Sequence, residues 1–197
     1  MFHEIKPDIR ARMQWLETQD SKDRIDGSQR SQRLRQIPRD TGRFLAVLAA
    51  GAPDGDIVEI GTSGGYSTLW LVVACIESDR QVTTFEIASD KVDIARETFR
   101  LAGVTDRVNL VHGDAKEFLK QRDGIAFCFL DAEKQEYQDF YDIVVPRLIT
   151  GGLLVADNVI SHAEHLQSFV SGVEADVRVD SLVVPIGKGE LLCRRVP

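Results

Sequence analysis

The sequence has no long hydrophobic segment. A membrane-spanning helix needs about 20 apolar residues in a row, and one of the longest apolar runs, residues 69–76, falls well short of that. The N-terminal stretch MFHEIKPDIRARMQWLE carries charges throughout, which is not the pattern of a secretory signal. These absences predict a protein that has no membrane partner and lies in the cytoplasm.

Cysteine is scarce as well. The chain has three cysteines, Cys75, Cys128 and Cys193, which are far apart and form no CxxC pair. An odd number of widely spaced cysteines does not suggest a disulfide framework or a zinc-binding motif. We therefore expect reduced and mostly buried thiols.

A surplus of positive charge is also missing. The chain has 24 Lys and Arg against 31 Asp and Glu, a formal net charge of −7. Nucleic-acid affinity depends largely on cationic side chains, so this balance makes a nucleic-acid partner unlikely without excluding one. The segment from Lys22 to Arg43 is the exception, and it is either a solvated helix face or a contact for an acidic substrate or RNA. Its arginines are Arg24, Arg30, Arg33, Arg35 and Arg39.

The length of 197 residues predicts one domain covering the whole chain, 1–197. Residues 1–40 are polar and form an N-terminal, partly helical arm that ends near Ile37 and Pro38. A helix over about residues 41–50 follows, before Gly51 and Pro53 end it.

From residue 56 onward, short β-prone runs alternate with segments of helical periodicity. This order predicts an α/β fold, a doubly wound and mostly parallel sheet with helices on both faces. Only five residues join the last two strands, too few for a parallel crossover, so we expect an antiparallel hairpin with one reversed strand at the edge. The predicted strands are 56–60, 81–86, 107–111, 125–131, 152–157, 177–184 and 190–195, and the helices between them are about 66–77, 89–102, 115–121, 135–149 and 161–172.

Five predicted strands end in, or are soon followed by, an acidic residue. In open α/β sheets the carboxyl ends of the strands converge on the crevice where ligands bind. The five acids should therefore surround a single site. They are Glu59, Glu86, Asp114, Asp131 and Asp157.

The first strand leads into a glycine-rich turn, GTSGGYS over residues 61–67. Glycine lets the backbone pass close to a ligand, but the segment is not GxGxxG, the dinucleotide fingerprint. Glu59 suits a ligand that carries an ammonium or sulfonium group, and Glu86 is placed to accept hydrogen bonds from both hydroxyls of a ribose. The pattern favours a cofactor site, and the alternative is a tight turn without a ligand.

Asp131, Asp157 and Asn158 come from two strands that should be neighbours. Carboxylate and amide oxygens suit Mg²⁺, Mn²⁺ or Ca²⁺ better than zinc. The alternative is that Asp157 caps the following loop and Asn158 makes a turn. A cation beside Lys134 would favour its neutral amine, which makes this lysine a candidate general base. Tyr137 and Tyr141 are interpreted as packing residues.

These segments resemble the cation-dependent O-methyltransferases, the group that contains the catechol and caffeoyl-CoA O-methyltransferases and their small bacterial relatives. The resemblance extends from about Ile37 to Arg195. VEIGTSGGYSTLWL resembles the first cofactor motif, TFEIASDKVDIAR the ribose-binding segment and GDAKEFL the adenine-side turn. FLDAEKQEY and GGLLVADNVI resemble the two metal motifs, which are the most specific part.

The resemblance implies a Rossmann-like class I methyltransferase fold, S-adenosylmethionine as cofactor and a divalent cation, with Mg²⁺ favoured. It implies that Asp131, Asp157 and Asn158 hold the cation, that Asp131 also lies at the cofactor, and that Lys134 takes the proton of a small-molecule acceptor with vicinal hydroxyls, such as a catechol. A homodimer is implied too. The remaining cofactor-binding residues would be Glu59, Gly61, Ser63 and Ser67 at the methionine end, Glu86 at the ribose, and Asp114 and Ala115 at the adenine.

The chain differs from its longer relatives in its short, arginine-rich arm and in the immediate start of a helix after Asn158. In the family those parts select the acceptor, so the acceptor cannot be taken over from the relatives. Three alternative functions of the chain also stay open: a tRNA methyltransferase that uses the same site, a non-catalytic binding protein, and a nicotinamide-dependent dehydrogenase.

Overall fold

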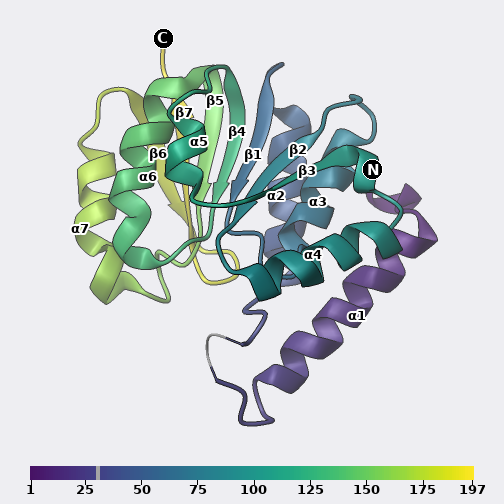
Figure 1. The fold of residues 1–197 in the computed structure, drawn as a ribbon. Helices are drawn as coiled ribbons and strands as arrows, with labels where there is room; N and C mark the ends of the chain where they lie inside the picture. Colours follow the sequence, from purple (N-terminus) through teal and green to yellow (C-terminus); the bar gives the residue numbers. More distant parts are fainter. Residues whose placement is uncertain (30–31) are drawn as a thin grey trace.

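The computed structural model describes residues 1–29 and 32–197, so Arg30 of the arginine-rich segment lies outside the described residues. Seven strands form one sheet in the order β3-β2-β1-β4-β5-β7-β6, with helices on both faces (Figure 1). The predicted α/β doubly wound sheet is thereby confirmed. The strands are β1 Asp56–Ile60, β2 Val82–Glu86, β3 Val108–His112, β4 Ile125–Leu130, β5 Leu148–Ala156, β6 Val179–Val184 and β7 Glu190–Arg195.

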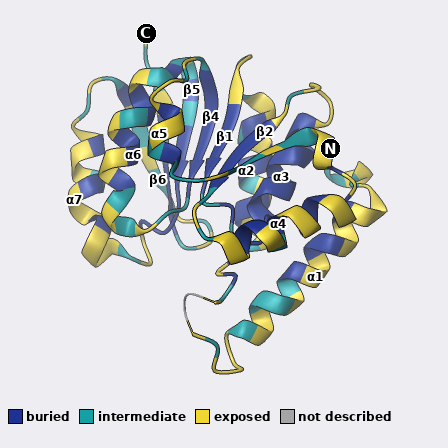
Figure 2. Ribbon diagram, viewed as in Figure 1, coloured by how far each residue is buried: buried dark blue, intermediate teal, exposed yellow. Residues whose placement is uncertain are grey.

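Side chains of the central strand β4 alternate between two hydrophobic cores. Phe127 and Phe129 point into the core beneath α1–α4, while Cys128 and Leu130 point into the core beneath α5–α7. All six residues of β4 are buried, as expected for a parallel strand that is covered on both faces (Figure 2). The helices are α1 Pro7–Asp23, α2 Arg39–Gly51, α3 Tyr66–Cys75, α4 Ser89–Leu101, α5 Ala115–Leu119, α6 Tyr137–Val144 and α7 Ala163–Glu174.

The C-terminal hairpin is antiparallel, as predicted, but its last strand does not form the outer edge. Strand β7 lies between β5 and β6 and is antiparallel to both. Leu191 and Cys193 are consequently fully buried. Both edges of β7 are already paired, so its LLC stretch offers no free strand edge to a second copy. The homodimer itself stays a prediction.

Two predicted boundaries differ near Pro146. Helix α6 ends at Val144, because a 3₁₀ turn that contains the proline follows it. Strand β5 then begins at Leu148 instead of residue 152, since a shift in register with β4 accommodates the extra residues. Gly151 has a positive φ of 81° within this irregular part, a conformation that glycine adopts without strain.

The N-terminal arm is attached to the domain through α1, which packs against α3 and α4. Arg12 is buried and donates to the Thr98 hydroxyl at 3.0 and 3.1 Å. At the other end of α1, the Tyr66 hydroxyl donates to Glu17 at 2.5 Å. These contacts hold α1 beside α3 and α4 (Figure 1).

All three cysteines are buried free thiols, as predicted. Among the helices of the described residues, none is long and apolar enough to cross a membrane.

Gly42 provides a test of the packing between α2 and α3. A Cβ added at Gly42 would lie 2.2 Å from Cδ1 of the buried Trp70, whereas one at Gly51, the last residue of the same helix, would meet nothing within 4 Å. We expect Gly42→Ala to lower the free energy of unfolding by about 1–3 kcal/mol through overpacking. Gly51→Ala should leave it unchanged or raise it slightly, because alanine favours helix. Urea unfolding measures both, and equal stabilities for the two variants would contradict this packing.

Candidate active site

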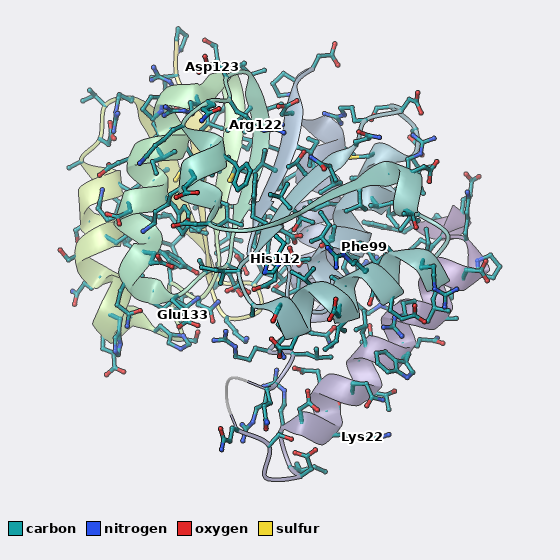
Figure 3. All side chains as sticks on the ribbon, viewed as in Figure 1. Lys22, Phe99, His112, Arg122, Asp123 and Glu133 are labelled. Atoms are coloured by element: carbon teal, nitrogen blue, oxygen red, sulfur yellow. The ribbon has the colours of Figure 1, made fainter. Side chains whose placement is uncertain are left out.

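A cavity of about 740 Å³ lies at the carboxyl ends of the parallel strands. This volume is within the range of ordinary small-molecule sites. The wall of the cavity includes the glycine-rich turn after β1, the end of β2, and the loops after β3, β4 and β5. Glu133, labelled in Figure 3, lies on the loop after β4 and belongs to this wall. Of the predicted site residues, the cavity is lined by Gly61, Ser63, Ser67, Glu86, Asp114, Ala115, Asp131, Lys134 and Asn158.

Gly61 permits a very close approach between the turns after β1 and β4. It has a φ of +99°, and a Cβ at this position would lie 2.2 Å from the backbone oxygen of Asp131. A side chain there would force the two turns apart. Ser63 follows in a left-handed conformation with a φ of 47°. Gly61 thus allows the tight packing of two turns, and the predicted close approach of this backbone to a ligand stays a prediction.

The Glu86 carboxylate is fixed by three backbone amides. Its Oε2 accepts from the Ser63 N–H at 2.7 Å, and its Oε1 accepts from the N–H groups of Ile87 and Ala88 at 2.9 Å. These bonds hold the end of β2 against the turn after β1. The carboxylate lies in the cavity wall, where its remaining lone pairs can accept hydrogen bonds from a ligand.

Asp114 and Ala115 form the start of the short helix α5. The Asp114 side chain caps this helix by accepting from the Lys116 N–H at 2.9 Å. Both residues line the cavity beside Gly113. The turn after β3 is thus held rigid at the side where the resemblance predicts the adenine.

Glu59 lies behind the cavity wall and does not line it. Its side chain is fully buried, and its Oε2 accepts from the Thr68 and Thr84 hydroxyls at 2.5 and 2.6 Å. Burial raises the pKa of Glu59 to about 7, and the hydroxyls of Ser67, Thr68 and Thr84 oppose the rise. The prediction of a direct cofactor contact is corrected on this point, since Ser67 stands at the wall instead.

Lys134 lines the cavity and belongs to a polar network. Its Nζ donates to Asp131 Oδ1 at 3.1 Å, to the Ala132 carbonyl at 3.0 Å and to the Tyr137 hydroxyl at 2.7 Å. The Asn158 amide also donates to Asp131 Oδ1, at 3.1 Å. The structure therefore brings together Lys134, Asp131 and Asn158, as the sequence predicts.

Tyr137 has a larger role than the predicted packing. Its ring is fully buried and packs edge-on against Phe169. Its hydroxyl accepts from Lys134 and donates to the Asp157 carbonyl at 3.0 Å. A tyrosine three residues after a candidate base is a weak sequence signal, and only the fold shows that Tyr137 connects Lys134 with the end of β5. Tyr141 packs as predicted, against Phe169, and its hydroxyl donates a hydrogen bond to the Asp176 carboxylate.

Asp157 is fully buried and is not among the residues that line the cavity. Its Oδ1 accepts from the Asn158 N–H at 2.6 Å, and Asn158 has a φ of 73°. The capping turn that was the alternative interpretation is therefore present. Asp157 Oδ2, however, has no hydrogen-bond partner among the described residues. A cap does not explain that buried, unsatisfied oxygen.

Glu190 is a residue that the sequence analysis missed. It opens β7, is fully buried, and neither of its carboxyl oxygens has a partner among the described residues. Burial and the adjacent Asp157 carboxyl raise the pKa of Glu190, and burial together with Asp131 raises that of Asp157. The only sign of it in the sequence was an acidic residue directly after Gly189. Its position beside Asp157 could not be recognised there, because it depends on the pairing of β7 with β5.

Residues 32–38 of the arginine-rich segment have no regular secondary structure, and several of them line the cavity. Arg24, Arg33 and Arg35 line the cavity, and Arg35 also pairs with Glu133 at 3.0 Å. The Ser63 hydroxyl holds the segment by donating to the Leu34 carbonyl at 2.7 Å. Arg33 and Arg35 do not lie on a helix, so the interpretation as a solvated helix face is wrong for these two, whereas Arg24 caps α1 and pairs with Asp20. Contact with an acidic substrate or RNA stays a prediction.

The O-methyltransferase family matches residues 24–196 of the chain. Among curated relatives, the chain is 26% identical over 184 residues to a caffeoyl-CoA O-methyltransferase of Populus kitakamiensis, a match that covers 81% of this chain and 78% of the relative. It is 36% identical over 121 residues to the catechol O-methyltransferase of Mycobacterium tuberculosis, covering 60% of this chain and 54% of the relative.

Solved structures agree on the fold. A methyltransferase of Podospora anserina with SAH bound superposes with a TM-score of 0.81 at 23% identity, covering 98% of this chain and 89% of that one. The O-methyltransferase TomG of Streptomyces achromogenes, in complex with SAM, gives a TM-score of 0.77 at 23% identity and coverages of 92% and 89%. The class I methyltransferase fold is thus confirmed.

The chain therefore belongs to the O-methyltransferase family. The predicted reaction class, transfer of a methyl group to oxygen by an enzyme, is confirmed at this level. The non-catalytic and nicotinamide-dependent alternatives are set aside with it.

Replacing Glu59 with glutamine should change how stability depends on pH. The pKa of Glu59 is about 7 in the folded protein against an ordinary value of 4.5. The folded state therefore binds more protons than the unfolded state between these values, and stability falls as pH rises through that window. In the ligand-free protein, we expect Glu59→Gln to match the wild type near pH 4.5 and to exceed it by up to about 3 kcal/mol at pH 8.

Urea unfolding at several pH values measures this difference. The exposed Glu174→Gln on α7 serves as the control and should follow the wild type at every pH. A difference between Glu59→Gln and wild type that did not vary with pH would contradict the raised pKa.

Proposed function

We propose that the protein is an S-adenosylmethionine-dependent and divalent-cation-dependent O-methyltransferase that acts on a small acceptor with vicinal hydroxyls, such as a catechol. The observation that carries the proposal is the arrangement of one cavity. The glycine-rich turn, the fixed Glu86 carboxylate and the group of Lys134, Asp131 and Asn158 all line this one cavity. The caffeoyl-CoA and catechol O-methyltransferases among the relatives support the same acceptor chemistry.

The cofactor half of the cavity fits S-adenosylmethionine. Glu86 would accept hydrogen bonds from the ribose hydroxyls, and Ser67 would contact the methionine end. Asp114 and Ala115 would border the adenine. Glu59, buried behind Ser67, would add a negative charge near the sulfonium without touching it.

The donors after β4 and β5 fit a divalent cation. Asp131, Asp157 and Asn158 offer the hard oxygens that Mg²⁺ prefers, and the unpartnered Oδ2 of Asp157 is an open donor. Within the described residues, no three His, Cys, Asp or Glu side chains are already grouped to hold a metal. The Asn158 amide must turn its oxygen inward, because its nitrogen faces Asp131.

When bound, S-adenosylmethionine supplies an electrophilic methyl group, and a divalent cation lowers the pKa of a hydroxyl that it contacts. Lys134 removes the proton from the acceptor hydroxyl, and the resulting oxygen is then free to attack. Tyr137 and the Ala132 carbonyl fix the position of Nζ during this transfer. Positioning by these residues should contribute much of the rate enhancement.

The decisive experiment measures methyl transfer from labelled S-adenosylmethionine to a simple catechol, with Mg²⁺ and then with EDTA. We expect turnover that EDTA abolishes and that added Mg²⁺ restores. Turnover that is indifferent to EDTA would disprove the cation dependence and leave the cofactor assignment standing. A bound cofactor without turnover would move the search to larger acceptors.

Lys134→Met should remove the base while it retains the length of the side chain. We expect kcat/KM to fall at least about 100-fold, the usual contribution of a positioned general base, with unchanged affinity for S-adenosylmethionine. Lys120→Met is the matched control, because Lys120 is exposed at the end of α5 and does not line the cavity. Full activity of the Lys134 variant would rule out the proposed base.

A second candidate is a tRNA acceptor at the same site. It is favoured by Arg24, Arg33 and Arg35 in the cavity wall and opposed by the net charge of −7. Phosphate contacts would make binding fall steeply with salt. Binding to unmodified tRNA that is absent, or that does not weaken between 50 and 200 mM salt, would exclude this candidate.

A further inference from the structure

Asp157 and Glu190 form a buried pair of acidic side chains between β5 and β7. Both residues are 0% exposed, and their carboxyl groups are within hydrogen-bonding reach of each other. Three of their four oxygens, Asp157 Oδ2 and both Oε atoms of Glu190, have no partner among the described residues. Buried polar groups in native proteins are nearly always satisfied, so this cluster requires an explanation.

Hydrogen bonding within the protein satisfies this pair only while a proton is held between the two carboxyl groups. The Thr41 hydroxyl, itself fully buried, lies beside Glu190. Lys188 lies at the cavity wall and acts on Asp157 through its charge. If both carboxyl groups were ionised, they would repel each other, and each would also lose its hydration. A divalent cation would take the place of the shared proton and compensate both negative charges.

We propose that Glu190 is an additional oxygen ligand of the cation site, sharing the ion with Asp157. The inference rests on the cation dependence in the proposed function and adds a residue from β7 to the donors after β4 and β5. Strand pairing supports the placement, because Leu191 is paired with Ala156, so that the residue preceding Leu191 and the residue following Ala156 meet at the end of the hairpin. A third carboxylate should raise the affinity of the site for divalent ions, since ligand charge tunes that affinity.

The test measures Mn²⁺ binding to the whole protein by electron paramagnetic resonance, without acceptor or cofactor. Compared are the wild type, Glu190→Gln, Asp157→Asn and the exposed control Glu174→Gln. We expect Glu190→Gln to weaken Mn²⁺ binding at least about 10-fold, as loss of a metal-site partner usually does, and Glu174→Gln to leave it unchanged. Thermal unfolding in EDTA should show Glu190→Gln no less stable than the wild type, and added Mn²⁺ should raise its Tm less.

Glu190→Met provides a second variant in case glutamine is poorly tolerated, because an apolar side chain of similar size suits a buried position. It should fold and lose the same Mn²⁺ affinity. If Asp157→Asn abolishes Mn²⁺ binding while both Glu190 variants bind like the wild type, the inference is overturned and the proposed cation dependence stands. If the wild type binds no Mn²⁺ although it binds S-adenosylmethionine, the inference and the cation dependence both fail, and cofactor-dependent transfer remains.

Discussion

The ladder of backbone hydrogen bonds continues one residue beyond the parallel strands, and the site depends on this extension. Gly61 N–H donates to the Phe85 carbonyl at 3.1 Å, Asp131 N–H to that of Ile60 at 2.9 Å, and Asp157 N–H to that of Leu130 at 3.0 Å. Each first residue after a strand is thus fixed by its neighbouring strand. A site built on such positions holds its geometry better than one built on free loops.

This rigidity requires several acidic groups to be buried near one another. Glu59, Asp157 and Glu190 are all fully buried, and burial raises the pKa of each. Buried charge is costly unless it is paired. Glu59 is partly compensated by two threonine hydroxyls, whereas the Asp157–Glu190 pair lacks comparable partners among the described residues. Burying these acidic groups therefore lowers the stability of the folded protein, and a positive charge bound beside them would offset that cost.

The sequence was sufficient to predict the sheet and most of the cavity wall for a simple reason. Strand-end positions such as Glu86 and Asp131 follow from local hydrophobic patterns, and topology alone makes them converge. Glu190 could not be found this way, because its role depends on β7 pairing with β5 instead of forming the edge. The position of residues 32–36 was not predicted for the same reason: nothing local in them indicates that Ser63 and Lys91 hold this stretch at the cavity through hydrogen bonds to the carbonyls of Gln32, Arg33 and Leu34.

The arm, the glycine-rich turn and the loop after β4 are joined by hydrogen bonds in the cavity wall. Ser63 donates its N–H to Glu86 and its hydroxyl to the Leu34 carbonyl of the arm. The next residue of the arm, Arg35, pairs with Glu133 on the loop after β4. The same serine therefore holds both the Glu86 carboxylate and the arm, so that a change in the glycine-rich turn would alter both parts of the cavity wall.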